Sequence, residues 1–407
     1  MTIALFGCGA MGQAAALAMI EDPQLPDLLL VDVSPDRIAT TVDFLRRHHP
    51  DRPIATACID INDERSLAKL LSKIEIVAAS LPWPATESLA LGCLQHQRPM
   101  ISITRPNYAT LKELADGAQK ARGTILLGCG LEPGLAEIVG RHTATKFGAV
   151  RRLDIRCGGI PIHPEPPLNY ALLFGTQLPL TPREAFFVSG GRLVATRRFE
   201  GLETIHIPGL GFLEAFHDGL LPSFHADEAL CDIPDISQKT LRWPGFAAAA
   251  QLLSKLGFLS DQPVLVDGVA MSPRAATNAV LRPLVTTAPS SDTCVLLVRA
   301  EGVDTANRAA IATCLIQDMH DSATGLTAMA RMTGFTLAAI VGLFFAGKVE
   351  GTGLLLPHQA IREAAVEALL ARLRERGVRI HHDVSTGQDR HLLPNTSLAP
   401  SQSQGMR

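Results

Sequence analysis

The sequence predicts an α/β protein: an N-terminal, doubly wound parallel sheet joined to an inserted α/β domain with a mixed, open sheet. Three features of the chain lead to this prediction. A glycine-rich turn follows the first apolar run, strands and helices alternate as far as residue 128, and the later apolar runs alternate in the manner of hairpins. The chain has 407 residues, which is long for one domain and favours two.

The glycine-rich turn lies between a short apolar run at residues 2–6 and a good helix former at residues 13–20. The turn reads Gly-Cys-Gly-Ala-Met-Gly over residues 7–12, and a second apolar run ends at Asp32. A strand before the turn, a helix after it and an acid about 20 residues further on are the context that the Rossmann dinucleotide-binding motif requires. We therefore predict that this segment binds a nicotinamide dinucleotide.

Each residue of the turn has its own role in this prediction. Gly7 permits the tight turn, Gly9 lets a pyrophosphate approach because it has no Cβ, and Gly12 lets the helix lie close to the strand. The unpaired amide groups at the start of the helix, at Ala10 and Met11, are expected to face the phosphate anion.

Asp32 favours NAD over NADP, because its carboxylate can accept hydrogen bonds from both ribose hydroxyls and repels a 2′-phosphate. Arg37 is the one nearby residue that favours NADP instead. Asp60 follows the next strand and is a candidate to border the adenine, although it also fits the start of a turn. Leu81 and Pro82 end a later strand, where we expect them to line the nicotinamide ribose.

The rest of the first domain continues the alternation that a parallel sheet requires. Further strands are predicted at residues 54–61, 74–81, 100–104 and 124–128, and helices at residues 66–73, 86–95 and 111–121. Residues 1–130 are accordingly predicted to form the Rossmann domain.

The pattern changes after residue 130. A helix is predicted over residues 131–147, strands at 152–157, 262–269 and 293–301, a hairpin over 186–199, and a final long helix over 323–347. We predict a substrate and dimerisation domain over residues 131–323. Residues 324–384 are predicted to be C-terminal helices that pack back on the Rossmann domain, and residues 385–407, rich in Ser, Gln, Pro and Asn, to be a disordered tail.

Composition excludes several classes of protein. Hydrophobic residues make up 47% of the chain, charged residues 19%, and the net charge is −3 without a basic block, which argues against nucleic-acid binding. The first strand begins at Thr2, and the most apolar helical stretch, 333–346, is short for a membrane span. The eight cysteines are too scattered for a zinc knuckle or a redox pair. We therefore expect a cytoplasmic protein with no metal site and no membrane or nucleic-acid partner.

Several separate motifs, in order along the chain, make the sequence resemble the saccharopine dehydrogenase superfamily, from Thr2 to about Pro357. Within it the chain is most similar to L-lysine 6-dehydrogenases and saccharopine reductases. The motifs are Gly-Cys-Gly-Leu-Glu-Pro-Gly at 128–134, Cys-Gly-Gly-Ile-Pro at 157–161, Pro-Glu-Pro-Pro-Leu-Asn-Tyr at 164–170, Leu-Glu-Ala-Phe-His at 213–217, Thr-Leu-Arg-Trp-Pro-Gly at 240–245 and Thr-Ala-Met-Ala-Arg at 327–331.

The resemblance implies a Rossmann domain, a second α/β domain with an open sheet, and often a homodimer made through that sheet. It implies hydride transfer between NAD and the carbon that bears the amine of an amino acid, as in the oxidative deamination of lysine. A second interpretation is reductive condensation of an aldehyde with an amine, as in saccharopine or carboxynorspermidine formation, which needs a cleft with several cationic groups. A third is an NAD-binding protein without catalytic activity.

Three departures from the family pattern motivate the third interpretation. Saccharopine reductases carry a lysine where this chain has Leu91, and lysine 6-dehydrogenases carry an aspartate after the fifth strand, where this chain has Thr104 and Arg105. The lysine 6-dehydrogenases also have a Thr-Ser-Gly-Gly-like run where this chain has residues 217–222. These differences leave the reaction class in place and the identity of the substrate open.

A guanidinium suits the carboxylate of an amino-acid substrate, because it can donate two parallel hydrogen bonds. Arg242, in a motif where the family keeps an arginine, is the first candidate for this role and Arg105 the second. Tyr170, which follows Pro-Glu-Pro-Pro, is a candidate to line the pocket, although it also fits a packing role.

Loss of hydride from a carbon that bears an amine requires the amine to be neutral, so a side chain must accept the ammonium proton. Glu132 is one candidate, because it lies in the Gly-Leu-Glu-Pro-Gly turn, where saccharopine reductases have an aspartate. It could equally serve the dipole of the following helix. His217 is the other candidate base, since the ordinary histidine pKa lies near neutral pH.

Overall fold

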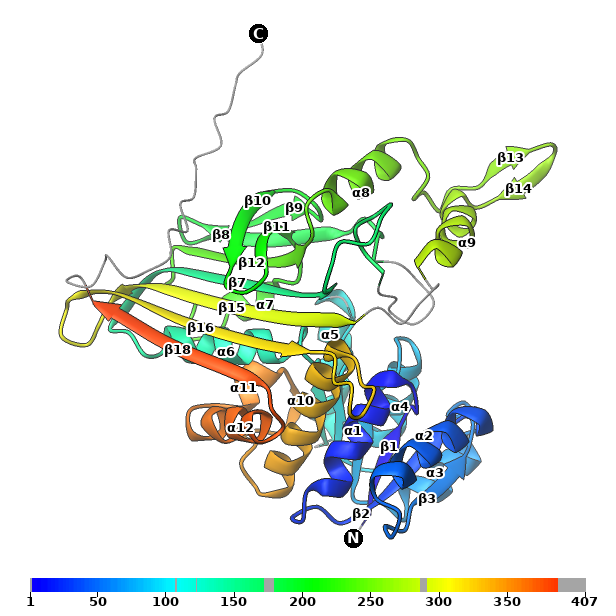
Figure 1. Ribbon diagram of the computed structural model, residues 1–407. Helices are drawn as coiled ribbons and strands as arrows, with labels where there is room; N and C mark the ends of the chain where they lie inside the picture. The colour runs from blue at the N-terminus through cyan, green and yellow to red at the C-terminus, as the bar shows by residue number, and fades with distance from the viewer. Residues whose placement is uncertain (1, 107, 122, 172–178, 286–290, 387–407) are drawn as a thin grey trace.

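The computed structural model describes residues 2–106, 108–121, 123–171, 179–285 and 291–386. The strands of these residues form two large sheets and one small ribbon (Figure 1). This arrangement confirms the predicted fold class, a parallel doubly wound sheet together with a mixed sheet.

The first sheet contains seven strands, and all of its pairings are parallel. Its strands are β1 Thr2–Phe6, β2 Asp27–Asp32, β3 Ala55–Cys58, β4 Ile76–Ala79, β5 Met100–Ser102, β6 Thr124–Leu127 and β17 Gly353–Leu355. They lie in the order β17-β6-β5-β4-β1-β2-β3. The first-domain helices are α1 Ala10–Glu21, α2 Pro35–His48, α3 Glu64–Leu71, α4 Ala85–Gln95 and α5 Tyr108–Ala121.

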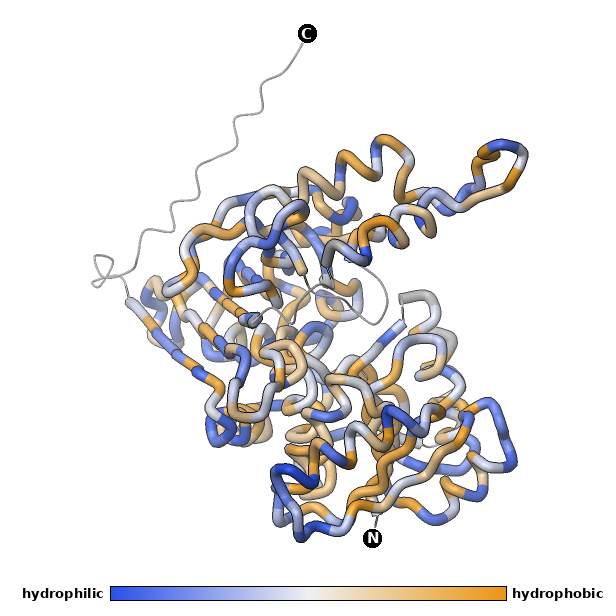
Figure 2. Tube along the Cα trace, turned by 45° about the vertical axis from the view of Figure 1, so that its right-hand side comes forward, coloured by the Kyte–Doolittle hydropathy of each residue, from blue (hydrophilic) through white to orange (hydrophobic). Residues whose placement is uncertain are grey.

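The inner strands of this sheet, such as β1 and β4, are apolar because helices cover both of its faces (Figure 2). In β1, Ile3 and Leu5 belong to the core that includes α1 and α2, whereas Ala4 and Phe6 belong to the core that includes α3 and α4. Because all the strands are parallel, their carboxyl ends lie at one edge of the sheet. Ligands bind at this edge in doubly wound folds.

The second sheet contains nine strands and is mixed, because β12 and β7 run parallel while its other pairs are antiparallel. Its strands are β7 Ala149–Pro161, β8 Glu184–Ser189, β9 Arg192–Arg197, β10 Glu203–Ile207, β11 Gly211–His217, β12 Asp235–Arg242, β15 Asp292–Val303, β16 Ala309–Met319 and β18 Arg379–Thr386. The order is β10-β11-β12-β7-β15-β16-β18, and β8 pairs with both β12 and β9.

One face of the second sheet is covered by helix α6 (Leu135–Ala144), which joins it to the first domain. Leu153 and Ile155 of β7 share a core with Ile138 and Val139 of α6. The alternate residues of β7, among them Arg152 and Arg156, point to the opposite face. The two faces of this sheet therefore differ in chemistry.

The chain returns to the first domain through α10 (Ala328–Phe345), which packs on α1. A Cβ on Gly334 would lie 2.6 Å from the backbone O of Met11, so the two helices approach closely because this position has no side chain. Asp292 helps to start α10 by accepting hydrogen bonds from the backbone N of Ala328 (2.6 Å) and Met329 (2.9 Å).

Helix α10 is the one helix of the described residues that is long and apolar enough to span a membrane, and 83% of the span is buried inside the protein. This burial is typical of a core helix. The remaining helices are α7 Pro222–His225, α8 Phe246–Lys255, α9 Pro273–Val285, α11 Pro357–Ala360 and α12 Ala364–Glu375.

The last segment of the chain corrects part of the sequence prediction. Within residues 324–384, α10 and β17 do join the first domain, but β18 pairs with β16 in the second sheet. This strand runs through Thr386, so a tail beginning at residue 385 would start inside it. Residues 387–407 lie outside the described residues.

The predicted strand at residues 262–269 is instead a two-stranded ribbon, β13 Val264–Val266 and β14 Val269–Met271. Asp267 and Gly268 connect them with positive φ angles of 50° and 82°. An Asp-Gly pair favours this conformation in tight hairpins, and the sequence analysis missed that signal.

Candidate functional site

The glycine-rich turn joins β1 to α1 at the carboxyl edge of the first sheet. Gly7 has a φ of +98°, and a Cβ there would lie 2.3 Å from the backbone O of Ser80. A Cβ on Gly12 would lie 1.9 Å from the backbone O of Gly7, so both positions require glycine for packing. A Cβ on Gly9 would meet nothing within 4 Å.

The turn fits a dinucleotide diphosphate. Gly9 directly precedes α1. A side chain at this position would occupy the open space beside the amide groups of Ala10 and Met11 in the first helical turn. Because these amides have no partner earlier in the helix, the helix start attracts an anion.

Asp32 is buried, with an exposed fraction of 6%. One carboxylate oxygen accepts a hydrogen bond from the backbone N of Cys8 (2.8 Å), and the other accepts one from the backbone N of Ser34 (2.9 Å). Asp32 therefore ties the glycine-rich turn to the end of β2. Each oxygen keeps a second acceptor position, which leaves capacity for ribose hydroxyls.

The other predicted cofactor residues lie along the same edge. Asp60 is exposed, and its carboxylate accepts hydrogen bonds from the backbone N (2.9 Å) and Nδ2 (3.0 Å) of Asn62, so it forms a turn after β3. The backbone O of Leu81 accepts hydrogen bonds of 3.1 Å from the hydroxyls of Thr86 and Thr104, which fixes the chain just before Pro82.

Glu132 lies in the turn between β6 and α6, where the two sheets meet. Its Oε1 atom accepts a hydrogen bond of 2.8 Å from Nε2 of Gln238 on β12. The residue is partly exposed, but its carboxyl group is enclosed, and this burial raises the carboxyl pKa to about 8. Gln238 opposes the shift, whereas the nearby carboxyls of Glu137 and Asp218 add to it.

Arg105 connects the first domain to the second rather than presenting a free guanidinium. Its Nη1 atom donates to Oε1 of Glu137 (2.9 Å), and its Nη2 atom donates to the backbone O of Gly219 (2.9 Å). Glu137 in turn accepts a hydrogen bond from the backbone N of Gly134 (2.6 Å), at the start of α6. The structure thus places Arg105 in an interdomain contact next to Glu132.

Arg242, at the end of β12, is buried with an exposed fraction of 4%. Its Nη1 atom donates to the backbone O of Leu241 (2.7 Å), but its Nε atom has no partner within the described residues. The guanidinium carbon lies 4.6 Å from the ring centre of Tyr170, whose buried hydroxyl also lacks a partner there. Buried donors without acceptors are rare in folded proteins, so these two side chains need a partner that the described residues do not supply.

The sequence analysis missed Arg198 and Asp218, which complete this group. Oδ2 of Asp218 lies 2.9 Å from Nε of Arg198, and its Oδ1 accepts a hydrogen bond of 2.8 Å from Nε of Arg183. Burial alone would raise the Asp218 pKa, but the two arginines hold it below its ordinary value. Asp218 directly follows one of the recognised motifs, whereas no local pattern distinguishes Arg198.

Strand β12 brings these residues together, because side chains two positions apart point to the same face of a strand. Gln238 contacts Glu132, Thr240 donates a hydrogen bond of 3.3 Å to Oδ2 of Asp218, and Arg242 follows two positions later. The candidate site therefore combines an acid whose pKa is raised, two guanidiniums that pair with Asp218, and Arg242, whose charge also lowers the pKa of Asp218. This arrangement suits an anionic substrate and proton transfer.

His217 lies on the other face of the second sheet. It pairs in register with Lys239 and not with Gln238 or Thr240. Its ring stacks on Phe187 with centres 4.7 Å apart, and burial together with Lys239 and Arg156 lowers its pKa to about 4. The structure does not bring the two predicted bases together.

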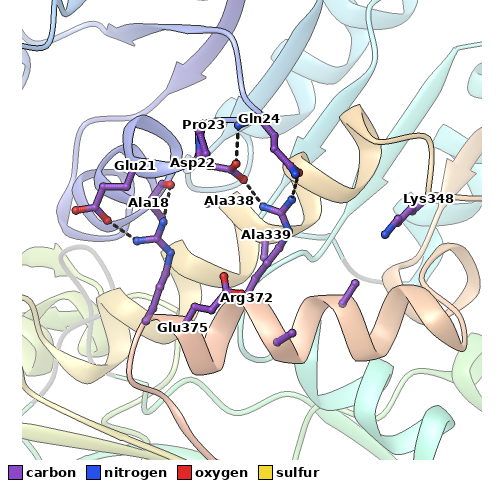
Figure 3. A pocket seen from close by; sticks show the side chains of 13 residues that line it. Ala18, Glu21, Asp22, Pro23, Gln24, Ala338, Ala339, Lys348, Arg372 and Glu375 are labelled. Carbon is purple, nitrogen blue, oxygen red and sulfur yellow. Dashed lines mark hydrogen bonds and ion pairs between the residues drawn. The ribbon is translucent and has the colours of Figure 1, made fainter.

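A cavity of about 430 Å³ lies between the C-terminal end of α1, α10 and α12, at the end of α1 remote from the glycine-rich turn (Figure 3). Its arginines are already engaged: Arg372 bonds to Asp22 and Gln24, and Arg376 donates to Glu21 (2.6 Å). These pairs hold α12 against α1, and the cavity is distinct from the candidate site. The described residues contain no group of three or more His, Cys, Asp or Glu side chains that could hold a metal ion.

Comparison with known proteins gives a family match over the second half of the chain. The model of the saccharopine dehydrogenase C-terminal domain family matches residues 130–378. The chain is 24% identical over 243 residues to the NADP+-dependent, L-glutamate-forming saccharopine dehydrogenase of Pyricularia oryzae. The aligned region covers 55% of this chain and 52% of that protein. It is also 24% identical over 227 residues to the α-aminoadipic semialdehyde synthase of Arabidopsis thaliana, covering 50% of this chain and 20% of that protein.

These curated relatives are longer proteins, and the chain spans about half of their length or less. Two solved structures share the fold. The apo L-glutamate-forming saccharopine dehydrogenase of Saccharomyces cerevisiae has a TM-score of 0.76 at 16% identity, covering 94% of this chain and 99% of that one. The homospermidine synthase of Legionella pneumophila, solved in complex with NAD, has a TM-score of 0.59 at 11% identity, covering 94% and 91%.

Proposed function

This chain belongs to the saccharopine dehydrogenase family, as its sequence motifs predicted, and we propose that it is an NAD-dependent oxidoreductase acting on the C–N bond of an amino acid. The observation that carries this proposal is the proximity of Glu132 to the buried guanidinium of Arg242, whose Nε has no partner in the part of the chain that the structure describes. A perturbed acid next to a positively charged binding group is a common feature of active sites.

In the oxidative direction, Glu132 accepts a proton from the substrate ammonium. With a pKa of about 8, its carboxyl exists in both protonation states near neutral pH, which is suitable for a group that takes up and releases a proton in each cycle. The electron pair of the adjacent C–H bond leaves as hydride while the C=N bond forms, and water then hydrolyses the imine. Bound NAD supplies the hydride acceptor.

Arg242 and Tyr170 are proposed to hold the substrate carboxylate. Both side chains are buried, and both have a donor without a partner in the described residues. A carboxylate would accept hydrogen bonds from both, and the low local dielectric would strengthen the contact. Arg105 is assigned no substrate contact, because Glu137 and Gly219 already occupy its guanidinium.

A second candidate reaction is the reductive condensation of an aldehyde with an amino acid. The specific observation in its favour is the cluster of cationic groups, because Arg183 and Arg198 both pair with Asp218 and the charge of Arg242 also acts on that carboxylate. Three guanidiniums in one site suit a substrate with more than one carboxylate.

We further propose NAD as the preferred cofactor, with NADP less favoured, because Asp32 lies where a 2′-phosphate would be repelled. A cytoplasmic location and a homodimeric state complete the proposal.

The deciding experiment incubates the purified full-length protein with NAD and, one at a time, lysine, ornithine, saccharopine and diamines, while the absorbance of reduced nicotinamide is recorded. The reverse assay combines reduced cofactor, glutamate and an aldehyde. Reduction of NAD by lysine supports oxidative deamination, and turnover of saccharopine or of the condensing pair supports the second reaction. No turnover with any substrate, in a protein that binds NAD, would support the non-catalytic interpretation.

A further inference from the structure

Arg105 belongs to the first domain, and its side chain holds two segments that lie next to Glu132. It follows β5 at the carboxyl edge of the first sheet. Its Nη1 atom donates to Oε1 of Glu137 (2.9 Å), and its Nη2 atom donates to the backbone O of Gly219 (2.9 Å). A Cβ on Gly128 would lie 3.3 Å from Cδ of Arg105, so the aliphatic part of this side chain lies against the start of the turn that carries Glu132.

Gly219 is the first of the two contact points, and it lies directly against the proposed proton acceptor. A Cβ on Gly219 would lie 2.6 Å from Oε1 of Glu132 and 2.8 Å from Nε2 of Gln238, so only a residue without a side chain fits here. Its φ of +88° also favours glycine. Leu221, two residues further on, packs against a core of the first domain. The segment around Gly219 therefore covers the Glu132 carboxyl where the two domains meet.

Glu137 is the second contact point, and it shares a hydrogen-bond donor with the proposed proton acceptor. Nε2 of Gln238 lies 2.8 Å from Oε1 of Glu132 and 3.4 Å from Oε1 of Glu137. Glu137 is 1% exposed, and its Oε2 atom accepts a hydrogen bond from the backbone N of Gly134 (2.6 Å). A buried carboxylate needs an ion pair to stay charged, and Arg105 provides it.

We propose that Arg105 is a positioning residue for the reaction: it holds two neighbouring segments closed over the Glu132 carboxyl and so keeps water away from that acid. This inference rests on the proposed function, in which Glu132 accepts the substrate proton. In this role Arg105 acts through the two groups that it holds and touches no reacting atom.

The causes of the raised Glu132 pKa agree with this role. Burial is the largest of them, and the charge of Glu137 adds to it. Both causes depend on a contact of Arg105, because the Gly219 segment covers the carboxyl and Glu137 is held charged beside it. Removing the guanidinium should therefore lower the Glu132 pKa twice over, since the acid gains water and Glu137 loses the partner that favours its carboxylate form.

Other charged and ionisable groups face Glu132 from the neighbouring strands. They are Cys157 on β7, Arg183 before β8, Asp218 after β11 and Arg242 at the end of β12. Within the described residues, the hydrogen bonds of Arg105 go to Glu137 and Gly219 instead. Replacing Arg105 therefore reaches Glu132 through those two contacts and leaves the ion pairs of Asp218 in place.

The test measures the Glu132 pKa by NMR of the full-length protein with isotope-labelled glutamate carboxyls, and the spectrum of Glu132→Gln assigns the signal. The wild type should titrate with a pKa of about 8. Arg105→Met should lower this pKa by about one to two units, and Arg105→Lys by less, since an ammonium can meet one of the two acceptors. The rising limb of kcat should move to lower pH by the same amount, with KM for the amino acid unchanged because Arg242 stays in place.

Arg141→Met is the matched control. Arg141 lies on α6 and pairs with Asp227 at 3.0 Å, and its side chain is 9% exposed, against 10% for Arg105. This variant loses an equally buried ion pair and should be destabilised to a similar degree, but its Glu132 pKa and its kcat limb should not change. Circular dichroism and thermal unfolding show whether each variant is folded.

An unchanged Glu132 pKa in a folded Arg105→Met variant would overturn the inference. An equal fall in Arg141→Met would do the same, because it would reduce the effect to a general loosening of the protein. A loss of kcat at every pH, without a shift of the limb, would leave Arg105 a purely structural residue. The proposed function fails separately, if the wild type turns over no amino acid while the NMR titration of Glu132 still responds to Arg105.

Discussion

Gln238 on β12 donates a hydrogen bond of 2.8 Å to the carboxylate of Glu132, which lies in the turn after β6. Burial favours the neutral acid, whereas the Gln238 amide favours the carboxylate, and the pKa of Glu132 settles at about 8. One bond between two segments about a hundred residues apart therefore adjusts the acid that we propose as the proton acceptor.

The oxidative rate should depend on pH through Glu132. Because the base must be unprotonated, kcat is expected to rise with pH and to level off above about pH 8. Glu132→Gln should remove this rising limb and most of the activity. Gln238→Leu removes a bond that favours the carboxylate and should shift the limb upward by about one unit. A limb at unchanged pH in Gln238→Leu would exclude this role for the bond.

Arg242→Met should weaken substrate binding. Losing a charge-assisted contact to a carboxylate costs about 2–3 kcal/mol, which corresponds to a rise in KM of roughly 30- to 100-fold. NAD affinity should not change, because Arg242 lies in the second domain. Arg299→Met is the control, since its guanidinium pairs with Glu301 at 2.6 Å. Steady-state kinetics on any active substrate measure the effect, and equal KM values in the two variants would contradict the assignment.

His217→Asn should keep kcat. The ring stacks on Phe187 and pairs in register with Lys239, on the face of the second sheet that does not contact Glu132. Comparing kcat of the His217→Asn and Glu132→Gln variants separates the two predicted bases. A large loss of kcat in a folded His217→Asn variant would return the histidine to the mechanism.

Two glycines of the cofactor turn should respond differently to substitution. Gly9→Val places a side chain in open space at the start of α1 and should abolish NAD binding while the protein keeps its melting temperature. Gly12→Ala forces a Cβ to 1.9 Å from the backbone O of Gly7 and should lower the melting temperature itself. Calorimetry with NAD and thermal unfolding measure both effects, and normal NAD binding by Gly9→Val would exclude a diphosphate at this position.

His358 should make the protein less stable in mild acid. Its ring is buried with an exposed fraction of 1%, and burial lowers its pKa to about 4. Between this value and its ordinary pKa of 6.5, the unfolded chain binds a proton that the folded chain does not. The free energy of unfolding of the wild type, relative to that of His358→Phe, should therefore be about 2 kcal/mol lower at pH 5 than at pH 7. Denaturant unfolding at both pH values measures it, and a constant difference would contradict the shifted pKa.

Features that depend on neighbouring residues were predictable from the sequence. The glycine-rich turn, the strand before it and the helix after it follow from local conformational preferences, and Gly7 and Gly12 prove to be sites where a Cβ has no room. The motifs around Glu132 and Arg242 led to two residues that the structure places near the same strand. Local signals were also overlooked, including the Ser34 cap and Pro35 that start α2 and the Asp-Gly turn of the ribbon.

The tertiary structure alone decided which charged groups meet. Sequence gives no measure of whether a guanidinium has a partner: Arg105 is occupied by Glu137, while Arg242 keeps a buried donor that no described residue satisfies. Arg198 and Asp218 come together because separate strands pair in one sheet. His217 and Asp218 are adjacent in the chain but belong to opposite faces, since side chains of a strand alternate and a shift of one residue exchanges the two faces.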